Sequence, residues 1–232
     1  MAEDKQMTII EHLEELRGRL IKSVIALAIT TLLSFAFTKQ FLEVLIAPMG
    51  STLPVSASPT TTIVVFTKVA LISGLALAMP VLVYQLIRFI APGLTPQEKR
   101  YLYLILPGAT FSFIIGAAFA YFVMLPTAIP FLKGFLSDIV EPNWFIDRYI
   151  SFVTSLLFWV GLSFETPLVI FFLAKLGIIT SATLSRYRKY AILVVAVIAA
   201  VITPTPDPFN MILVMAPLTL LYEIGILLAK LA

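Results

Sequence analysis

The chain has 232 residues, of which 60% are hydrophobic and only 12% are charged, and its formal net charge is +3. A soluble domain of this size carries roughly 25% charged residues, so these proportions exclude a water-soluble globular protein. The small, scattered charge does not indicate a nucleic-acid-binding protein. Cysteine is absent and His12 is the only histidine. No disulfide, metal site or cofactor is therefore predicted.

Long uncharged apolar runs predict six transmembrane helices in one polytopic domain covering residues 1–232. The predicted spans are about 21–40, 67–90, 100–125, 149–175, 189–203 and 209–229. A span needs roughly 20 residues, and the fifth run falls short of that. Helices five and six are therefore expected to form a short hairpin.

Prolines occur inside four of the predicted helices, and each removes one internal hydrogen bond and bends its helix. They are Pro80, Pro107, Pro167 and Pro217. Kinks at these positions predict an all-α bundle that is curved and concave. The third helix is expected to end near Leu125, because prolines follow it closely.

Lysines and arginines are distributed unevenly between the two sides of the predicted bundle. Twelve of the 16 lie in the N-terminal segment, in the loops after helices two and four, or at the C-terminus. This asymmetry predicts a multi-pass protein of the cytoplasmic (inner) membrane with both termini in the cytoplasm. The long outer loops, 38–66 and 126–147, are expected to be ordered caps, with solvated linkers as the alternative.

The polar N-terminal segment predicts an amphipathic helix that lies along the inner membrane surface before turning into the first span. Thr8 and Glu11 have the spacing of a capping box. Glu15 and Arg19 are four residues apart, and such a pair can simply stabilise a helix. Glu11, Glu14 and Glu15 nevertheless lie where anionic headgroups would repel them. A site for a cationic ligand would explain this excess of carboxylates.

A second cytoplasmic carboxylate follows helix two. Pro92-Gly93 is expected to end that helix, and Thr95 with Glu98 forms another capping box at the start of helix three. A structural role for Glu98 is therefore plausible from sequence. Its place in a short loop would also allow it to face Glu15 across the bundle.

Glu165 is the ionisable residue inside the fourth predicted helix, where a charge is costly and suggests a function. It could take part in a proton relay, hold a water-filled pocket or bind a polar group; a neighbouring helix could also simply satisfy it. Pro167 is expected to kink the helix beside it. No histidine lies in a span to activate Ser163, and metalloprotease and phosphate-loop motifs are absent. An enzyme is not predicted.

Several segments, in order, resemble one family along nearly the whole chain: TatC, the polytopic receptor of the twin-arginine protein translocase. The segments that carry the resemblance are Glu11–Leu20, Ala78–Gln85 with Phe89–Leu94, Ala117–Phe122, Ser163–Pro167 and Thr203–Asp207. The first two are specific together. Two departures are small: Thr205 separates Pro204 from Pro206, and the chain lacks a charged C-terminal tail.

The resemblance implies a core receptor that binds twin-arginine signal peptides at its cytoplasmic face for export of folded proteins, driven by the proton-motive force. It assigns arginine recognition to Glu15 and Glu98, and carboxylates do pair well with guanidinium groups. Other positions that match the family are Arg17, Phe89, Pro48, Glu165 and Asp207. Implied partners are the single-span proteins TatA and TatB, the lipid bilayer and further copies of the chain.

Two other classes of function remain open at this point. A proton-coupled secondary transporter would use Glu165 as its coupling group, and would lose transport when Glu165 becomes glutamine. A purely structural scaffold would tolerate loss of either cytoplasmic glutamate. The receptor interpretation predicts instead that Glu15→Ala or Glu98→Ala abolishes cross-linking to a twin-arginine peptide.

Overall fold

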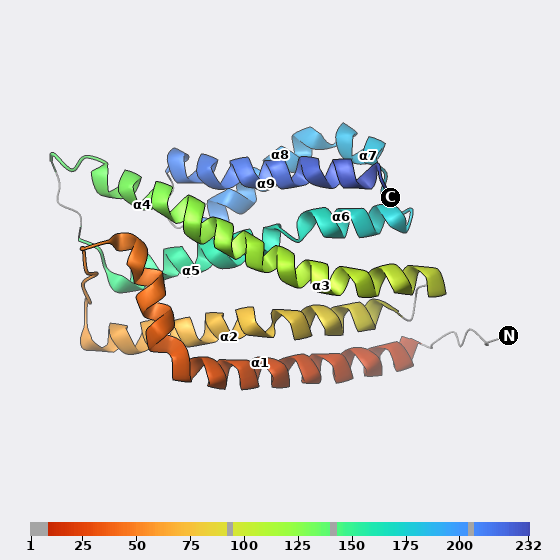
Figure 1. The fold of residues 1–232 in the computed structure, drawn as a ribbon, viewed down its shortest axis with the longest axis horizontal. Helices are drawn as coiled ribbons and strands as arrows, with labels where there is room; N and C mark the ends of the chain where they lie inside the picture. Colours follow the sequence, from red (N-terminus) through yellow and green to blue (C-terminus); the bar gives the residue numbers. More distant parts are fainter. Residues whose placement is uncertain (1–8, 92–94, 140–142, 204–206) are drawn as a thin grey trace.

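The computed structural model describes residues 9–91, 95–139, 143–203 and 207–232, apart from the side chains of residues 9 and 96–106. Its helices run mostly along one long axis (Figure 1). In chain order the elements are α1 (Ile9–Ile46), the 3-10 turn η1 (Ala47–Met49), α2 (Pro59–Ile90), α3 (Pro96–Phe119), the π-helix η3 (Ala120–Met124), α4 (Leu125–Gly134), α5 (Ile146–Ser163), α6 (Thr166–Lys175), α7 (Ser181–Arg186), α8 (Arg188–Ile202) and α9 (Pro208–Ala229). The predicted all-α fold is confirmed.

Within the described ranges, five helical segments are long and apolar enough to cross a membrane. They are Ile10–Met49, Pro59–Ile90, Pro107–Gly134, Ile146–Lys175 and Pro208–Ala229. The remaining apolar helix, α8, has 15 residues. At about 1.5 Å per residue it is shorter than a hydrocarbon core of roughly 30 Å. α9 has 22 residues, so of the two helices expected to be short, only α8 is.

The N-terminal amphipathic segment is not a separate surface helix. α1 runs through it and the first span without interruption, for 38 residues. No proline lies in this stretch, and once a helix has formed, adding residues to it costs little. The expected turn between a surface helix and the first span is therefore wrong. The last part of α1 bends away from the axis of the rest (Figure 1).

The third predicted helix does not end near Leu125. α3, η3 and α4 follow one another as one helical rod that continues to Gly134. In the π-helix η3 the Leu125 N–H donates to the carbonyl of Ala120. Pro126 then falls in the first turn of α4, where a residue without an N–H is tolerated. The rod therefore accommodates the proline that was expected to end it.

The fourth predicted helix is broken beside Pro167, as the sequence indicates. α5 ends at Ser163 and α6 begins at Thr166. Between them the Glu165 N–H donates to the carbonyl of Leu162 at 3.1 Å. Pro167 lies in the first turn of α6, where it offers no N–H. The predicted kink is confirmed, and it places Glu165 at the N-terminus of α6.

The two long outer loops are bonded to each other and to neighbouring helices. The Val55 N–H donates to the carbonyl of Trp144 at 2.7 Å, and the Ile146 N–H donates to the carbonyl of Val55 at 3.0 Å. Lys133 Nζ donates to the carbonyl of Met49 at 2.5 Å. These contacts agree with the expectation that the loops are ordered caps.

Tyr149 is 2% exposed, and its hydroxyl donates to the carbonyl of Leu45 in the last turn of α1 at 2.8 Å. We expect Tyr149→Phe to lower the free energy of unfolding by roughly 1 kcal/mol, because this buried carbonyl loses its donor. The measurement is the SDS fraction at which half of the protein is unfolded. Tyr121→Phe is the control, since its hydroxyl donates to Val44 in an exposed position. Equal effects of both changes would contradict the prediction.

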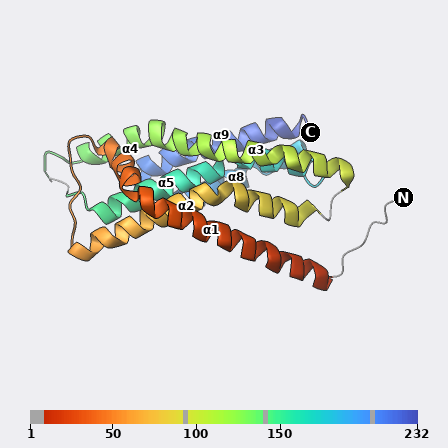
Figure 2. The ribbon, with the colours of Figure 1, turned by 60° about the horizontal axis from the view of Figure 1, so that its bottom comes forward.

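The main hydrophobic core joins the end of α1, α2, η3, α4, α5, α8 and α9. Fully buried representatives are Val69, Leu125, Val153, Ala199 and Val214. The start of α1, the end of α2, the start of α3 and the end of α9 lie together at one end of the bundle (Figures 1 and 2). η1 and the start of α9 lie at the other end. This arrangement creates two distinct ends, and the site residues divide between them.

Candidate functional site

The Glu15 carboxylate on α1 is linked to α2 through Arg19. Arg19 donates to its Oε1 from two atoms, Nη2 at 2.6 Å and Nε at 3.2 Å. The third donor atom of the guanidinium, Nη1, lies 3.4 Å from Oε1 of Gln85 on α2. Glu15 Oε2 is buried and receives no hydrogen bond from the described residues. Within the described part of the chain, one oxygen of this carboxylate is therefore without a donor.

An aromatic contact lies beside this carboxylate and fixes α1 against α2. The rings of His12 and Phe89 are stacked, with centroids 4.4 Å apart and planes 15° apart. His12 precedes Glu15 by one helical turn, and Phe89 follows Gln85 by one turn, so the two pairs lie on facing sides of the two helices. The structure thus brings Glu15 and Phe89 into one cluster.

Two other predicted residues belong to the same end of the bundle. Arg17 is exposed on α1, on a different side from the partly buried Glu15–Arg19 pair. Glu98 lies in the first turn of α3, whose start is at the same end as the start of α1 (Figures 1 and 2). Its side chain falls outside the part of the chain that the structure describes. Contact between Glu98 and Glu15 therefore stays a prediction.

Glu165 lies elsewhere, at the break between α5 and α6. Its side chain is partly buried, and Oε1 receives no hydrogen bond from the described residues. The hydroxyl of Ser163, two residues earlier, donates a hydrogen bond to the carbonyl of Trp159 at 2.7 Å. Glu165 is thus a polar group inside the predicted membrane span, at the junction of α5 and α6, whereas the Glu15 cluster is formed by α1 and α2.

Pro48 and Asp207 lie at the end opposite to Glu15. Pro48 is half-buried in η1. Asp207 caps α9: its Oδ1 accepts from the Asn210 backbone N–H at 2.7 Å, and its Oδ2 accepts from the Asn210 side chain at 2.9 Å. Neither is part of the Glu15 cluster. Both have a local structural explanation, as a turn residue and as a helix cap.

Comparison with known proteins gives this arrangement a context. A family model described as "Sec-independent protein translocase protein (TatC)" matches residues 11–217. This chain belongs to the TatC family. It is therefore a multi-pass membrane protein from a family of protein translocase components.

Two bacterial TatC proteins match over almost their entire length. The TatC protein of Carboxydothermus hydrogenoformans is 40% identical over 230 residues, which cover 98% of this chain and 95% of that protein. The TatC protein of Aquifex aeolicus is 42% identical over 232 residues, which cover 97% and 96%. A crystal structure described as the twin arginine translocase receptor TatC has a TM-score of 0.86 at 42% identity, covering 95% of this chain and 99% of that one.

Two members of the Glu15 cluster were not predicted from the sequence of this TatC family member. Gln85 is a neutral polar residue within an apolar span, and that position is a signal that could have singled it out. The stacking of His12 on Phe89 depends on how α1 and α2 face each other. No pattern along the chain indicates this pairing. Among the described residues no group of three or more His, Asp or Glu side chains could hold a metal ion.

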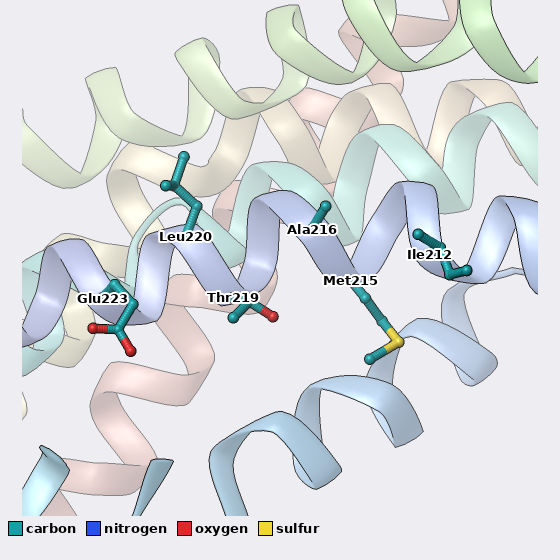
Figure 3. A pocket seen from close by; sticks show the side chains of 6 residues that line it. All are labelled: Ile212, Met215, Ala216, Thr219, Leu220 and Glu223. Atoms are coloured by element: carbon teal, nitrogen blue, oxygen red, sulfur yellow. The ribbon is translucent and has the colours of Figure 1, made fainter. Parts of the chain in front are cut away.

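α9 carries a shallow apolar groove of about 450 Å³, whose lining side chains are drawn in Figure 3. One charged side chain, Glu223, lines this groove. It forms an ion pair with Arg188, whose Nε and Nη2 donate to its two carboxylate oxygens at 2.7 and 2.8 Å. A second hollow of about 660 Å³ lies between α9 and the rod of α3, η3 and α4. The first groove, shown in Figure 3, is lined by Ile212, Met215, Ala216, Thr219, Leu220 and Glu223. These hollows agree with the predicted concave bundle.

Proposed function

We propose that this chain is the receptor of a twin-arginine translocase, and that it binds the consecutive arginines of a signal peptide at the Glu15 end of the bundle. The observation that carries the proposal is the mostly buried Glu15 carboxylate, one oxygen of which receives no hydrogen bond from the described residues, in a chain that matches the twin arginine translocase receptor TatC over nearly its whole length. A carboxylate at this position suits a guanidinium ligand, because the two groups pair through charge-assisted hydrogen bonds.

Two carboxylates are proposed to recognise two arginines, Glu15 from α1 and Glu98 from the first turn of α3. A guanidinium group is planar and donates through a fork that matches a carboxylate, whereas a lysine ammonium is a compact point charge. Phe89 and the exposed Arg17 complete the proposed binding surface. The apolar part of the signal peptide would lie against the membrane-facing side of the bundle.

The remaining parts of the proposal concern the membrane and the partners. The distribution of lysines and arginines supports a cytoplasmic location for the Glu15 end and for both termini, in the cytoplasmic (inner) membrane. Folded cargo would be passed outward with energy from the proton-motive force. TatA and TatB type proteins and further copies of this chain are the proposed partners. Glu165, inside the span, would be a polar contact for water or for a partner helix.

Cross-linking of a twin-arginine peptide to the full chain in membrane vesicles tests the site. We expect Glu15→Ala and Glu98→Ala each to abolish cross-linking, because each change would leave one guanidinium of the peptide without its carboxylate partner, at a cost of roughly 2 kcal/mol or more. A peptide with two lysines in place of the arginines should cross-link weakly to the unchanged chain.

Glu14→Ala is the matched control, since Glu14 is exposed and adjacent in sequence, and the change removes the same charge. It should leave cross-linking intact. Peptide binding that survives both the Glu15 and the Glu98 change would show that the site lies elsewhere. The proton-coupled transporter is not favoured by the family, and it alone predicts small-solute uptake that is lost in Glu165→Gln.

A further inference from the structure

We propose that Arg19 is a built-in competitor for the arginine of the ligand: it occupies Glu15 in the empty receptor and must be displaced when a signal peptide binds. This inference rests on the proposed function and concerns the regulation of the same site. It assigns a role to the Glu15–Arg19 pair beyond helix stabilisation, and it makes Gln85 a positioning residue for Arg19.

The pair is held more firmly than an ordinary surface ion pair. The side chains of Arg19 and Glu15 are 18% and 14% exposed. Two donor atoms of Arg19, Nη2 and Nε, reach the same oxygen of Glu15, at 2.6 and 3.2 Å. Gln85 accepts from the remaining arm of the guanidinium at 3.4 Å. The resident arginine is thus oriented by α1 and α2 together.

The chemistry of the resident group is the same as that of the proposed ligand. A carboxylate that already pairs with one guanidinium has no net charge left to attract another. Adding a second arginine beside Arg19 would place two cations against one anion in a largely buried space, which is unfavourable. Exchange of one guanidinium for the other conserves the charge balance. The displaced Arg19 can extend to the aqueous surface through its flexible stem.

Internal competition has a definite thermodynamic signature. It lowers the apparent affinity of every cationic ligand by the same factor, because that factor depends only on how strongly Arg19 holds Glu15. The ratio of arginine-peptide to lysine-peptide affinity is therefore set by Glu15 and Glu98, not by Arg19. Removing Arg19 should strengthen both affinities and leave their ratio unchanged.

The test measures binding of a fluorescent twin-arginine peptide, by anisotropy, to the purified full chain in lipid nanodiscs. We expect Arg19→Gln to lower Kd roughly fivefold to tenfold, the equivalent of one hydrogen bond of ordinary net strength, because the pair is partly exposed. The Kd of a twin-lysine peptide should fall by the same factor. Lys22→Gln is the matched control, because Lys22 is exposed on α1 and the change removes the same charge. It should leave Kd unchanged.

Gln85→Leu provides a second variant in which the ion pair itself remains. It should lower Kd about twofold, since Arg19 loses one of its anchors, and it should have no effect when combined with Arg19→Gln. This non-additivity separates a role through Arg19 from a general effect on packing. Thermal unfolding of each variant, followed by circular dichroism, confirms that the fold is retained.

The outcomes separate this inference from the proposed function. If the unchanged chain binds the peptide and Glu15→Gln abolishes binding, but Arg19→Gln leaves Kd the same or raises it, Arg19 is not a competitor. If Arg19→Gln lowered Kd for only one of the two peptides, the inference would be overturned as well. If the unchanged chain does not bind the twin-arginine peptide at all, the proposed function itself fails.

Discussion

Replacing Gly74 with alanine is expected to lower the free energy of unfolding by roughly 1–3 kcal/mol, as for overpacking in other tight cores. Gly74 lies where α2 crosses α1. A Cβ atom there would come within 2.5 Å of Thr31 Oγ1 and 2.6 Å of Thr31 Cα. The obstructing Cα is backbone, which cannot turn aside as a side chain can. The two helices would have to separate, and the Glu15 cluster between them would loosen.

Two other glycines provide graded controls for this change. A Cβ at Gly225 would meet mainly the flexible end of Ile170, at 2.5 Å from Cδ1, which can rotate away. Gly18 has open space around it, and alanine is the better helix former by roughly 1 kcal/mol. The expected order of unfolding free energies, measured by SDS titration with tryptophan fluorescence, is Gly18→Ala highest, then Gly225→Ala, then Gly74→Ala. A Gly74→Ala protein as stable as Gly225→Ala would contradict the proposed crossing.

Asp207→Ala is expected to lower the free energy of unfolding by roughly 2–4 kcal/mol, because it removes two kinds of contact at once. The carboxylate caps the first turn of α9 and also holds the side chain of Asn210. Asn210 is 1% exposed, and its Oδ1 already receives no hydrogen bond from the described residues. Without Asp207 its amide group would lose a partner in a buried position.

Asp207→Asn is the conservative comparison for this prediction. An asparagine also caps helices well, and its carbonyl oxygen can accept from the Asn210 N–H. We expect most of the lost stability to return. Asp138→Ala, at an exposed position in the outer loop, should have little effect. A loss in Asp207→Asn as large as in Asp207→Ala would mean that the negative charge, not the cap, is what matters.

Local signals along the chain predicted several features of the fold correctly. The short run before Thr203 predicted a helix too short to span, and α8 has 15 residues. Pro167 predicted the break beside Glu165, because a residue without an N–H weakens the hydrogen bonds of the preceding turn. Such features depend on composition and on residues close in sequence, so the sequence alone is sufficient to predict them.

The same kind of signal failed where the surrounding helix could adapt. Pro126 was expected to end the third helix, yet the π-helix η3 before it widens one turn and lets the helix continue to Gly134. The N-terminal amphipathic pattern predicted a surface helix that turns. α1 instead continues without interruption from the N-terminal segment into the span. Amphipathic periodicity describes one face of a helix and contains no information on where that helix ends.

The sequence by itself determined that this protein is a bundle of apolar helices, and which carboxylates would be unusual within it. It also indicated the Glu15–Arg19 pair, since residues four apart on a helix are neighbours. Only the tertiary structure decided that Gln85 would hold Arg19, that His12 would stack on Phe89, and that one oxygen of Glu15 would receive no hydrogen bond from the described residues. These contacts depend on the rotation and closeness of α1 and α2, which the packing of Gly74 against Thr31 sets.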